Sequence, residues 1–191
     1  DWLETWTPED PVNWDSGRAW KTLWVTTFSL TLAFITWFLV SALAPVLNNI
    51  GFDLSTSQLY WLTAMPGLAG GSLRLVWMFL PPVIGTRKLV WMSTLLFLFP
   101  LVGWGIAVQN PDTPYVTLLL LAIMAGIGGG VFSGFMPSTS YFFPKSKQGT
   151  ALGVQAGIGN FGVSIVQFVT PWVVGFSLIG AAQVFTNADT G

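Results

Sequence analysis

Long apolar stretches alternate with short polar connections along most of the chain. Each stretch is free of Asp, Glu, Lys and Arg over enough residues for a membrane-spanning helix of about 20 residues. The alternating segments of about 10 residues that mark transmembrane strands are absent from the sequence. The pattern therefore predicts an all-α integral membrane protein, with five spanning helices at about residues 22–48, 56–84, 89–108, 115–143 and 149–179.

The two ends of the chain are polar. Residues 1–21 are acidic and rich in tryptophan, lack the apolar core of a signal peptide, and are predicted to form a cytoplasmic N-terminal segment. Residues 180–191 are predicted to begin an external loop. Because the chain starts with Asp1 and an odd number of spans leaves its end in mid-loop, we expect it to be part of a longer protein.

The basic residues outside the spans fall on one side of this layout. That side carries Arg18, Lys21, Arg87, Lys88, Lys145 and Lys147, whereas the other side carries Asp53, Asp112 and Asp189. Lys and Arg are enriched in the cytoplasmic connections of membrane proteins. The distribution therefore predicts a multi-pass protein of the cytoplasmic membrane with its N-terminus in the cytoplasm.

Composition narrows the possible functions. Of 191 residues, 52% are hydrophobic and 8% are charged, where a soluble domain has about 25% charged residues. The absence of His and Cys excludes disulfides, thiol catalysis, histidine-ligated haem and the usual zinc sites from this chain. We expect a lipid bilayer as its environment, no cofactor, no metal, no nucleic-acid partner and no enzymatic activity.

Arg74 is the single charged residue between Asp53 and Arg87. It precedes Arg87 by about 20 Å of helix, which places it near the middle of a hydrocarbon core about 30 Å thick. A guanidinium at that depth costs a few kcal/mol or more unless protein, water or an anion surrounds it. One interpretation is a purely structural charge, whose partner is either a buried carboxylate from a missing segment or backbone carbonyls. The favoured one is an anion site, because the planar guanidinium binds a flat oxyanion through two hydrogen bonds.

Glycines and one asparagine mark the fourth and fifth predicted spans. The first group is Gly126, Gly128, Gly129, Gly130 and Gly134, and the second includes Gly149, Gly153, Gly157, Gly159 and Gly162. Small residues at this spacing let helices pack closely, which explains most of them, and helices that slide or bend use the same residues. Asn160 lies within the second group and either bonds a neighbouring helix or faces a small ligand, with Gln155 and Gln167 as weaker candidates.

These motifs resemble the NarK-type nitrate/nitrite porters of the major facilitator superfamily. The similar stretches are Trp6–Pro11, Gly70–Arg74, Gly85–Lys88, Phe142–Gly149 and the run from Gly153 to Phe168, which is similar to the nitrate signature of that family. The resemblance implies a twelve-span transporter of which this chain contains the first five helices. The chain departs from the family pattern at Met136–Ser140, so the shape of the fourth helix does not follow from the resemblance.

The resemblance also implies which residues bind the substrate. Arg74 matches the arginine that bonds the anion, and Asn160 matches the signature asparagine beside it. Phe34 and Phe132 stand where the family places two rings that sandwich the flat anion. Gly153, Gly157, Gly159 and Gly162 match the glycines of the signature. Nitrate, nitrite and the C-terminal half of the same transporter are therefore the expected partners.

The expected mechanism is transport by alternating access around a site at the bilayer midplane. The predicted spans contain no Asp, Glu or His, the groups that usually relay protons, so exchange of nitrate for nitrite is favoured over nitrate/proton symport. An anion channel is a further alternative, since an arginine and glycine-lined helices also suit a pore. An anchor subunit of a redox enzyme is disfavoured by the absence of histidine.

Overall fold

The computed structural model describes residues 5–175, and all the regular structure in that part of the chain is helical. The elements are α1 (Ser16–Leu47), the 3₁₀-helix η1 (Asn48–Ile50), α2 (Thr56–Trp77), α3 (Leu80–Ala107), α4 (Tyr115–Ala125), α5 (Ile127–Gly130), α6 (Phe132–Ser140) and α7 (Lys145–Gly175). The external loop predicted over residues 180–191 and the last part of the fifth predicted span lie outside the described residues.

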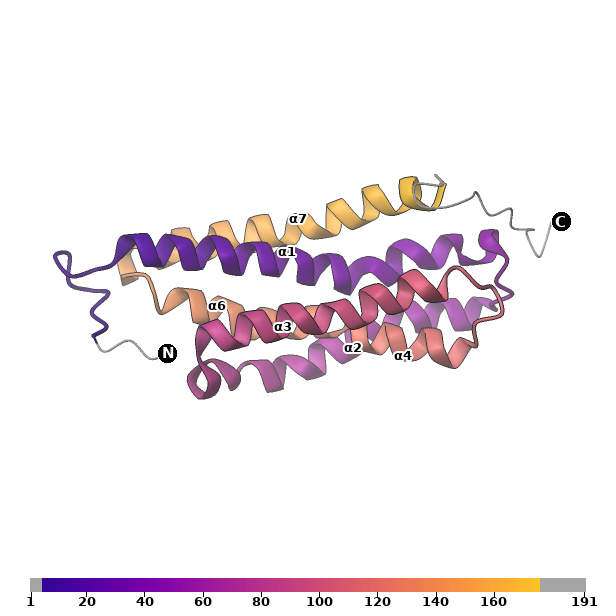
Figure 1. The fold of residues 1–191 in the computed structure, drawn as a ribbon, viewed down its shortest axis with the longest axis horizontal. Coiled ribbons are helices and arrows are strands. Elements are labelled where there is room, and N and C mark those ends of the chain that lie inside the picture. The colour runs from indigo at the N-terminus through magenta and orange to yellow at the C-terminus, as the bar shows by residue number, and fades with distance from the viewer. Residues whose placement is uncertain (1–4, 176–191) are drawn as a thin grey trace.

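The helices run back and forth along one long axis (Figure 1). α1 and α7 lie side by side, run in the same direction and form the most extensive helix pair of the bundle. α2 packs mainly against α4 and α5, and α3 mainly against α4 and α6. The consecutive segments α4, α5 and α6 therefore lie next to both α2 and α3.

Four helical segments of the described chain are long and apolar enough to cross a membrane: Ser16–Ile50, Leu80–Ala107, Tyr115–Ser140 and Lys145–Val173. The second predicted span, now α2, is not among them. With 22 residues it is about 33 Å long, enough for a hydrocarbon core. Its polar residues, Arg74 among them, and its glycines lower its apolarity, so length rather than hydropathy supports it as a span.

The second and third predicted spans differ from the observed helices at their junction. α2 begins after a capping box formed by Ser55 and Gln58, but it ends at Trp77 instead of near residue 84. Pro81 and Pro82 lie in the first turn of α3, where a missing N–H costs nothing. The expected loop at residues 85–88 is a kink within α3, at which Gly85 adopts φ 76°.

The fourth and fifth predicted spans also differ in detail from the structure. The fourth is divided at Gly126 and Val131, but both residues keep right-handed helical angles, so the segment continues in one direction. Pro137 lies inside α6. α7 begins at Lys145, earlier than the predicted residue 149, and continues past Pro171 without a break.

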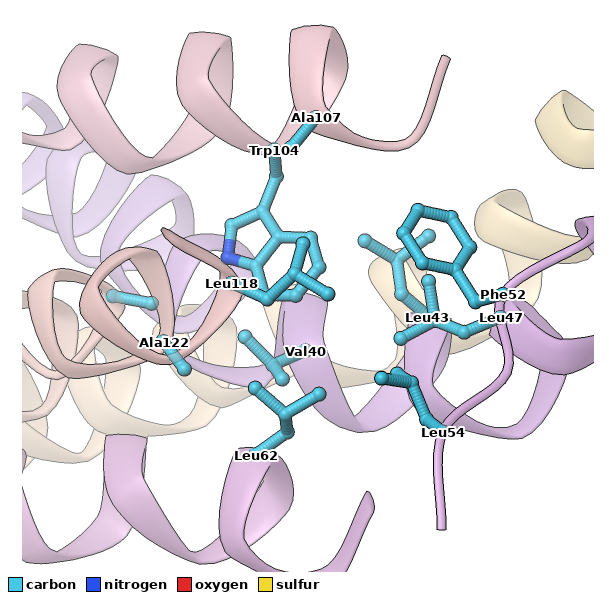
Figure 2. Close-up of a cluster of buried hydrophobic side chains, with 11 residues drawn as sticks. Val40, Leu43, Leu47, Phe52, Leu54, Leu62, Trp104, Ala107, Leu118 and Ala122 are labelled. Atoms are coloured by element: carbon cyan, nitrogen blue, oxygen red, sulfur yellow. The ribbon is translucent and has the colours of Figure 1, made fainter. Parts of the chain in front are cut away.

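A buried apolar cluster closes one end of the bundle (Figure 2). It contains Val40, Leu43, Leu47, Phe52, Leu54, Leu62, Trp104, Ala107, Leu118, Ala122 and Ala125. Phe52 and Leu54 come from the α1–α2 connection, which Asn48 holds in place by bonding the carbonyl of Leu54 at 2.9 Å and its N–H at 3.2 Å. The cluster therefore holds α1, α2, α3 and α4 together. It lies at the end of the bundle where the connections contain Asp53 and Asp112.

The opposite end of the bundle carries basic residues. A cavity of about 910 Å³ at this end is lined by Arg18 and Lys21 from α1 and by Arg87 from α3. The N-terminal segment packs on the same end, where the Trp14 indole donates to the carbonyl of Phe142 at 2.9 Å and Lys147 lies over the Trp14 ring. The charges separated by the sequence layout are thus also separated in space.

Candidate functional site

Arg74 projects from the last turn of α2 toward α1 and the α5–α6 junction. Its Nε donates a hydrogen bond to the carbonyl of Gly129 at 3.2 Å. With residues 5–175 alone around it, Arg74 is exposed. Within residues 5–175 the structure gives its remaining N–H groups no protein acceptor and no carboxylate partner. Of the structural partners considered from the sequence, a backbone carbonyl is therefore present at Gly129, and a carboxylate is absent from this part of the chain.

Two aromatic rings, and no carboxylates, lie next to the guanidinium in the described chain. Its Cζ lies 5.7 Å from the ring centre of Trp37 and 5.5 Å from that of Phe132. The Phe34 ring adjoins both, with its centre 5.8 Å from that of Trp37 and 6.2 Å from that of Phe132. We call Arg74, Trp37, Phe132 and Phe34 the arginine cluster. It brings together three of the four residues expected to bind the anion.

Arg74 lies at mid-height of the bundle for a reason other than the expected one. The sequence places it in the middle of one long helix, but α2 ends three residues after it. Its contacts Gly129 and Phe132 lie near the middle of the Tyr115–Ser140 segment. The guanidinium therefore lies near the middle of the bundle because of the residues that it contacts, and not because of its position in α2. At that depth in a membrane, a charge without a partner is costly.

Asn160 lies beside the arginine cluster but does not join it. Its neighbours Gly159 and Gly162 pack against α1, where a Cβ at Gly162 would come within 3.1 Å of the Phe34 Cβ. The Asn160 side chain is exposed, and its Nδ2 donates to the carbonyl of Ala156 in the same helix at 2.8 Å. The structure therefore places Asn160 at the height of Phe34 without a contact to Arg74 in the described chain.

The glycines divide into those that face another helix and those that do not. A Cβ at Gly126 would come within 2.9 Å of the Gly70 nitrogen, one at Gly130 within 2.7 Å of the Leu73 side chain, and one at Gly134 within 2.9 Å of the Trp77 carbonyl, so these three pack on α2. Gly128 and Gly129 of the same group pack on α1 instead, where an added Cβ would meet the Ala33 carbonyl and the Trp37 ring. In the second group, Gly159 and Gly162 pack on α1. A Cβ added at Gly153 or Gly157 would meet nothing within 4 Å in the described chain, so packing does not explain these two.

Trp37 is the member of the cluster that the sequence reasoning missed. Tryptophan and phenylalanine are so common in the spans that composition does not distinguish one ring from another. One signal is present, because Trp37 follows Phe34 by three residues and therefore shares its helix face. The two rings indeed lie together on α1.

The other two amides noted in the sequence have structural partners. Gln155 is fully buried, and its Nε2 lies 3.4 Å from the carbonyl of Phe135 in α6. Gln167 donates to the Ser41 hydroxyl on α1 at 2.8 Å. Both join α7 to its neighbours. The large cavity at the basic end of the bundle does not include any member of the arginine cluster.

The arginine cluster has the chemistry of a small-anion site. A guanidinium supplies a permanent positive charge and a rigid, flat set of donors. The ring faces of Trp37 and Phe132 stabilise that charge without adding an acceptor that would compete with an anion. No group of three or more His, Cys, Asp or Glu residues suited to a metal occurs among the described residues.

Comparison with known proteins gives one family match. The family model of the Major Facilitator Superfamily matches residues 26–186, which is most of the chain.

Individual relatives are nitrate or nitrite transporters by name. Over 189 residues, 97% of this chain, the sequence is 69% identical to the "Probable nitrate/nitrite antiporter NarK2" of Thermus thermophilus. It is 43% identical to the "Nitrate/nitrite transporter NarU" of Salmonella typhimurium over 90% of the chain, and 32% identical to the "Probable nitrate transporter NarT" of Staphylococcus carnosus over 80%. The resemblance that the motifs indicated is confirmed.

The chain spans less than half the length of these relatives. The aligned part covers 43% of the Thermus protein and 38% of each of the other two. These proportions agree with the N-terminal half of a transporter of this kind.

Proposed function

Because the chain belongs to the Major Facilitator Superfamily, we propose that the whole protein is a secondary active transporter for nitrate, nitrite or both, working by alternating access. The observation that carries the proposal is the Arg74 guanidinium, which lies at mid-height of the bundle, 5.7 and 5.5 Å from two aromatic ring centres, and has no carboxylate partner in the described chain. A small flat oxyanion is the ligand that would neutralise this charge through paired hydrogen bonds. The names of the relatives agree with nitrate and nitrite as that anion.

The proposed site divides its tasks among four residues. Arg74 supplies the charge and paired donors. The rings of Phe34 and Phe132 lie edge to face, with 74° between their planes, so one of them turns before both can enclose the flat anion. Asn160 supplies an amide donor after its side chain turns away from the Ala156 carbonyl. Gly153 and Gly157 have no neighbour against them in the described chain, so the α7 backbone is accessible to the anion or to the C-terminal half at these two positions. A C-terminal half of the same transporter would contribute a second arginine and complete the site.

The transport cycle follows from the charge on Arg74. With the site empty, two arginines facing each other across the midplane would repel and oppose the closed intermediate. A bound anion would remove that repulsion and let the halves rock from one opening to the other. We place the protein in the cytoplasmic membrane with the basic end of the bundle in the cytoplasm, because Arg18, Lys21 and Arg87 lie together there. In this scheme the protein carries out no covalent chemistry and is not an enzyme.

Nitrate/nitrite antiport is the proposed mode of coupling. The predicted spans of this chain contain no carboxylate or histidine to carry a proton, and one relative is named an antiporter. The test is uptake of labelled nitrate into proteoliposomes that contain the whole transporter. We expect internal nitrite to accelerate uptake and an imposed pH gradient to leave it unchanged.

Other outcomes of the same assay would identify the alternatives. Nitrate uptake into liposomes without internal anion, driven by a pH gradient, would indicate proton symport and contradict antiport. Single-channel current steps in planar bilayers would indicate an anion channel and contradict alternating access.

Substitution of Asn160 by alanine tests its predicted place beside the anion. The side chain is exposed and bonds only within its own helix in the described chain, so we expect Asn160→Ala to leave the melting temperature unchanged. Loss of one hydrogen bond to a charged ligand should weaken the nitrate Kd about tenfold, measured by titration calorimetry on the whole transporter.

The matched control is Gln167→Ala. Gln167 is an amide on the same helix, but it bonds Ser41. This variant should keep the wild-type Kd. An unchanged Kd for Asn160→Ala as well would return Asn160 to a packing role.

A further inference from the structure

Trp37 crosses from α1 into the space between α2 and α5. Its indole Nε1 donates a hydrogen bond to the carbonyl of Pro66 in α2 at 2.8 Å. On its own helix the ring contacts both Phe34 and Phe38, with ring centres 5.8 and 5.0 Å away, and those two phenylalanine rings stack on each other at 6.4 Å. The indole is therefore fixed at its polar tip by α2 and along its body by α1.

Glycines of two other helices form the slot that holds the indole. A Cβ added to Gly129 would come within 2.5 to 2.9 Å of three ring atoms of Trp37, and one at Gly128 within 3.0 Å of its Cβ. In α2, a Cβ at Gly70 would lie 3.0 Å from the indole nitrogen. Because these three glycines have no side chains, the backbones of α2 and α5 can approach the indole closely and leave a slot that it fills.

The slot also fixes where Arg74 can lie. Gly129 contacts the indole ring, and its carbonyl accepts the hydrogen bond from the Arg74 Nε at 3.2 Å. The guanidinium carbon then lies 5.7 Å from the centre of the Trp37 ring, within the range of a cation–π interaction. One residue of α5 thus connects the tryptophan to the arginine both sterically and through a hydrogen bond.

We propose that Trp37 is a positioning residue for anion binding: its ring face holds the Arg74 guanidinium in place while leaving its outer N–H groups for the ligand. This inference rests on the proposed function and deepens it. A carboxylate could hold the guanidinium more strongly, but it would occupy the donors that the anion needs. An aromatic face attracts the cation and accepts no strong hydrogen bond, so the arginine is placed without being neutralised.

Two substitutions separate the ring face from the packing of the residue. Trp37→Phe and Trp37→Leu both remove the N–H bond to Pro66 and both leave space in the slot, but the phenylalanine alone keeps a ring face. We expect the nitrate Kd of the whole transporter to rise about tenfold in Trp37→Leu and about threefold or less in Trp37→Phe. Calorimetric titration with sodium nitrate gives the Kd, and thermal unfolding gives the melting temperature of each variant.

Trp104→Leu is the matched control for general loss of packing. Trp104 is buried in the apolar cluster at the end of the bundle and does not contact the arginine cluster in the described chain. This variant should lower the melting temperature and keep the wild-type Kd.

Equal loss of affinity in Trp37→Phe and Trp37→Leu would show that packing or the indole N–H matters rather than the ring face, and would overturn the inference. A nitrate Kd of Trp37→Leu equal to that of the wild type would also overturn the inference about Trp37. In both cases the proposed function would stand as long as the wild-type transporter binds nitrate. Failure of the wild type to bind nitrate at all would overturn the proposed function and this inference together.

Discussion

Arg74→Lys should remove nearly all nitrate uptake by the whole transporter in proteoliposomes. Lysine keeps the positive charge but loses the planar set of donors that can bond two oxygens of one anion. It also loses the Nε that bonds the Gly129 carbonyl, so the ammonium group is no longer held between Trp37 and Phe132. The loss of two charge-assisted bonds corresponds to about 3 kcal/mol, or roughly a hundredfold in the nitrate Kd.

The matched control for this prediction is Arg18→Lys. Arg18 lies at the start of α1 in an exposed pair with Asp15 at 3.2 Å, where either cation serves. This variant should transport nitrate at the wild-type rate and show the same melting temperature. Normal uptake by Arg74→Lys would remove Arg74 from the binding site.

Gly162→Ala should impair both folding and transport. A Cβ at this position would collide with the backbone carbonyl of Thr31 and come within 3.1 Å of the Phe34 Cβ. The carbonyl belongs to the backbone of α1 and cannot move aside, so α1 and α7 must separate. Overpacking of this kind costs typically about 1–3 kcal/mol. We therefore expect a lower melting temperature and, because Phe34 is displaced, a weaker nitrate Kd.

Gly149→Ala is the control for Gly162→Ala. Gly149 lies in the same helix, but a Cβ there meets nothing within 4 Å in the described chain. Alanine in place of an unpacked helical glycine should leave the melting temperature unchanged or raise it slightly. If the two alanine variants unfolded at the same temperature, close packing at Gly162 would be ruled out as the reason for glycine there.

The sequence predicts the architecture well because it depends on features that are local in the chain. Apolar runs and turn residues locate the helices, and the all-helical fold and the family resemblance are confirmed. The junction between α2 and α3 is less predictable. Pro81 and Pro82 suggest the end of the second span, but proline suits the first turn of a helix as well as the residues after one. Gly85 then bends α3 where the sequence predicts a loop.

The arginine cluster is predictable in part, for reasons that lie in the packing. Arg74 is identifiable because an isolated charge in an apolar helix is costly wherever the helix faces. Trp37 is not, because its importance depends on Gly129 and Gly70 facing it across the bundle. The expected contact of Asn160 with the site is not seen in the described chain, because its side chain bonds the Ala156 carbonyl of its own helix.

Binding of the transported anion by the Arg74 guanidinium is the premise of the proposed transport cycle. A structure of the whole transporter with nitrate bound tests this directly. We expect a nitrate with two oxygens about 3 Å from the outer nitrogens of Arg74 and, once one ring has turned, its flat faces toward Phe34 and Phe132. Nitrate bound elsewhere, with Arg74 paired to a carboxylate from the remainder of the protein, would contradict anion binding by Arg74.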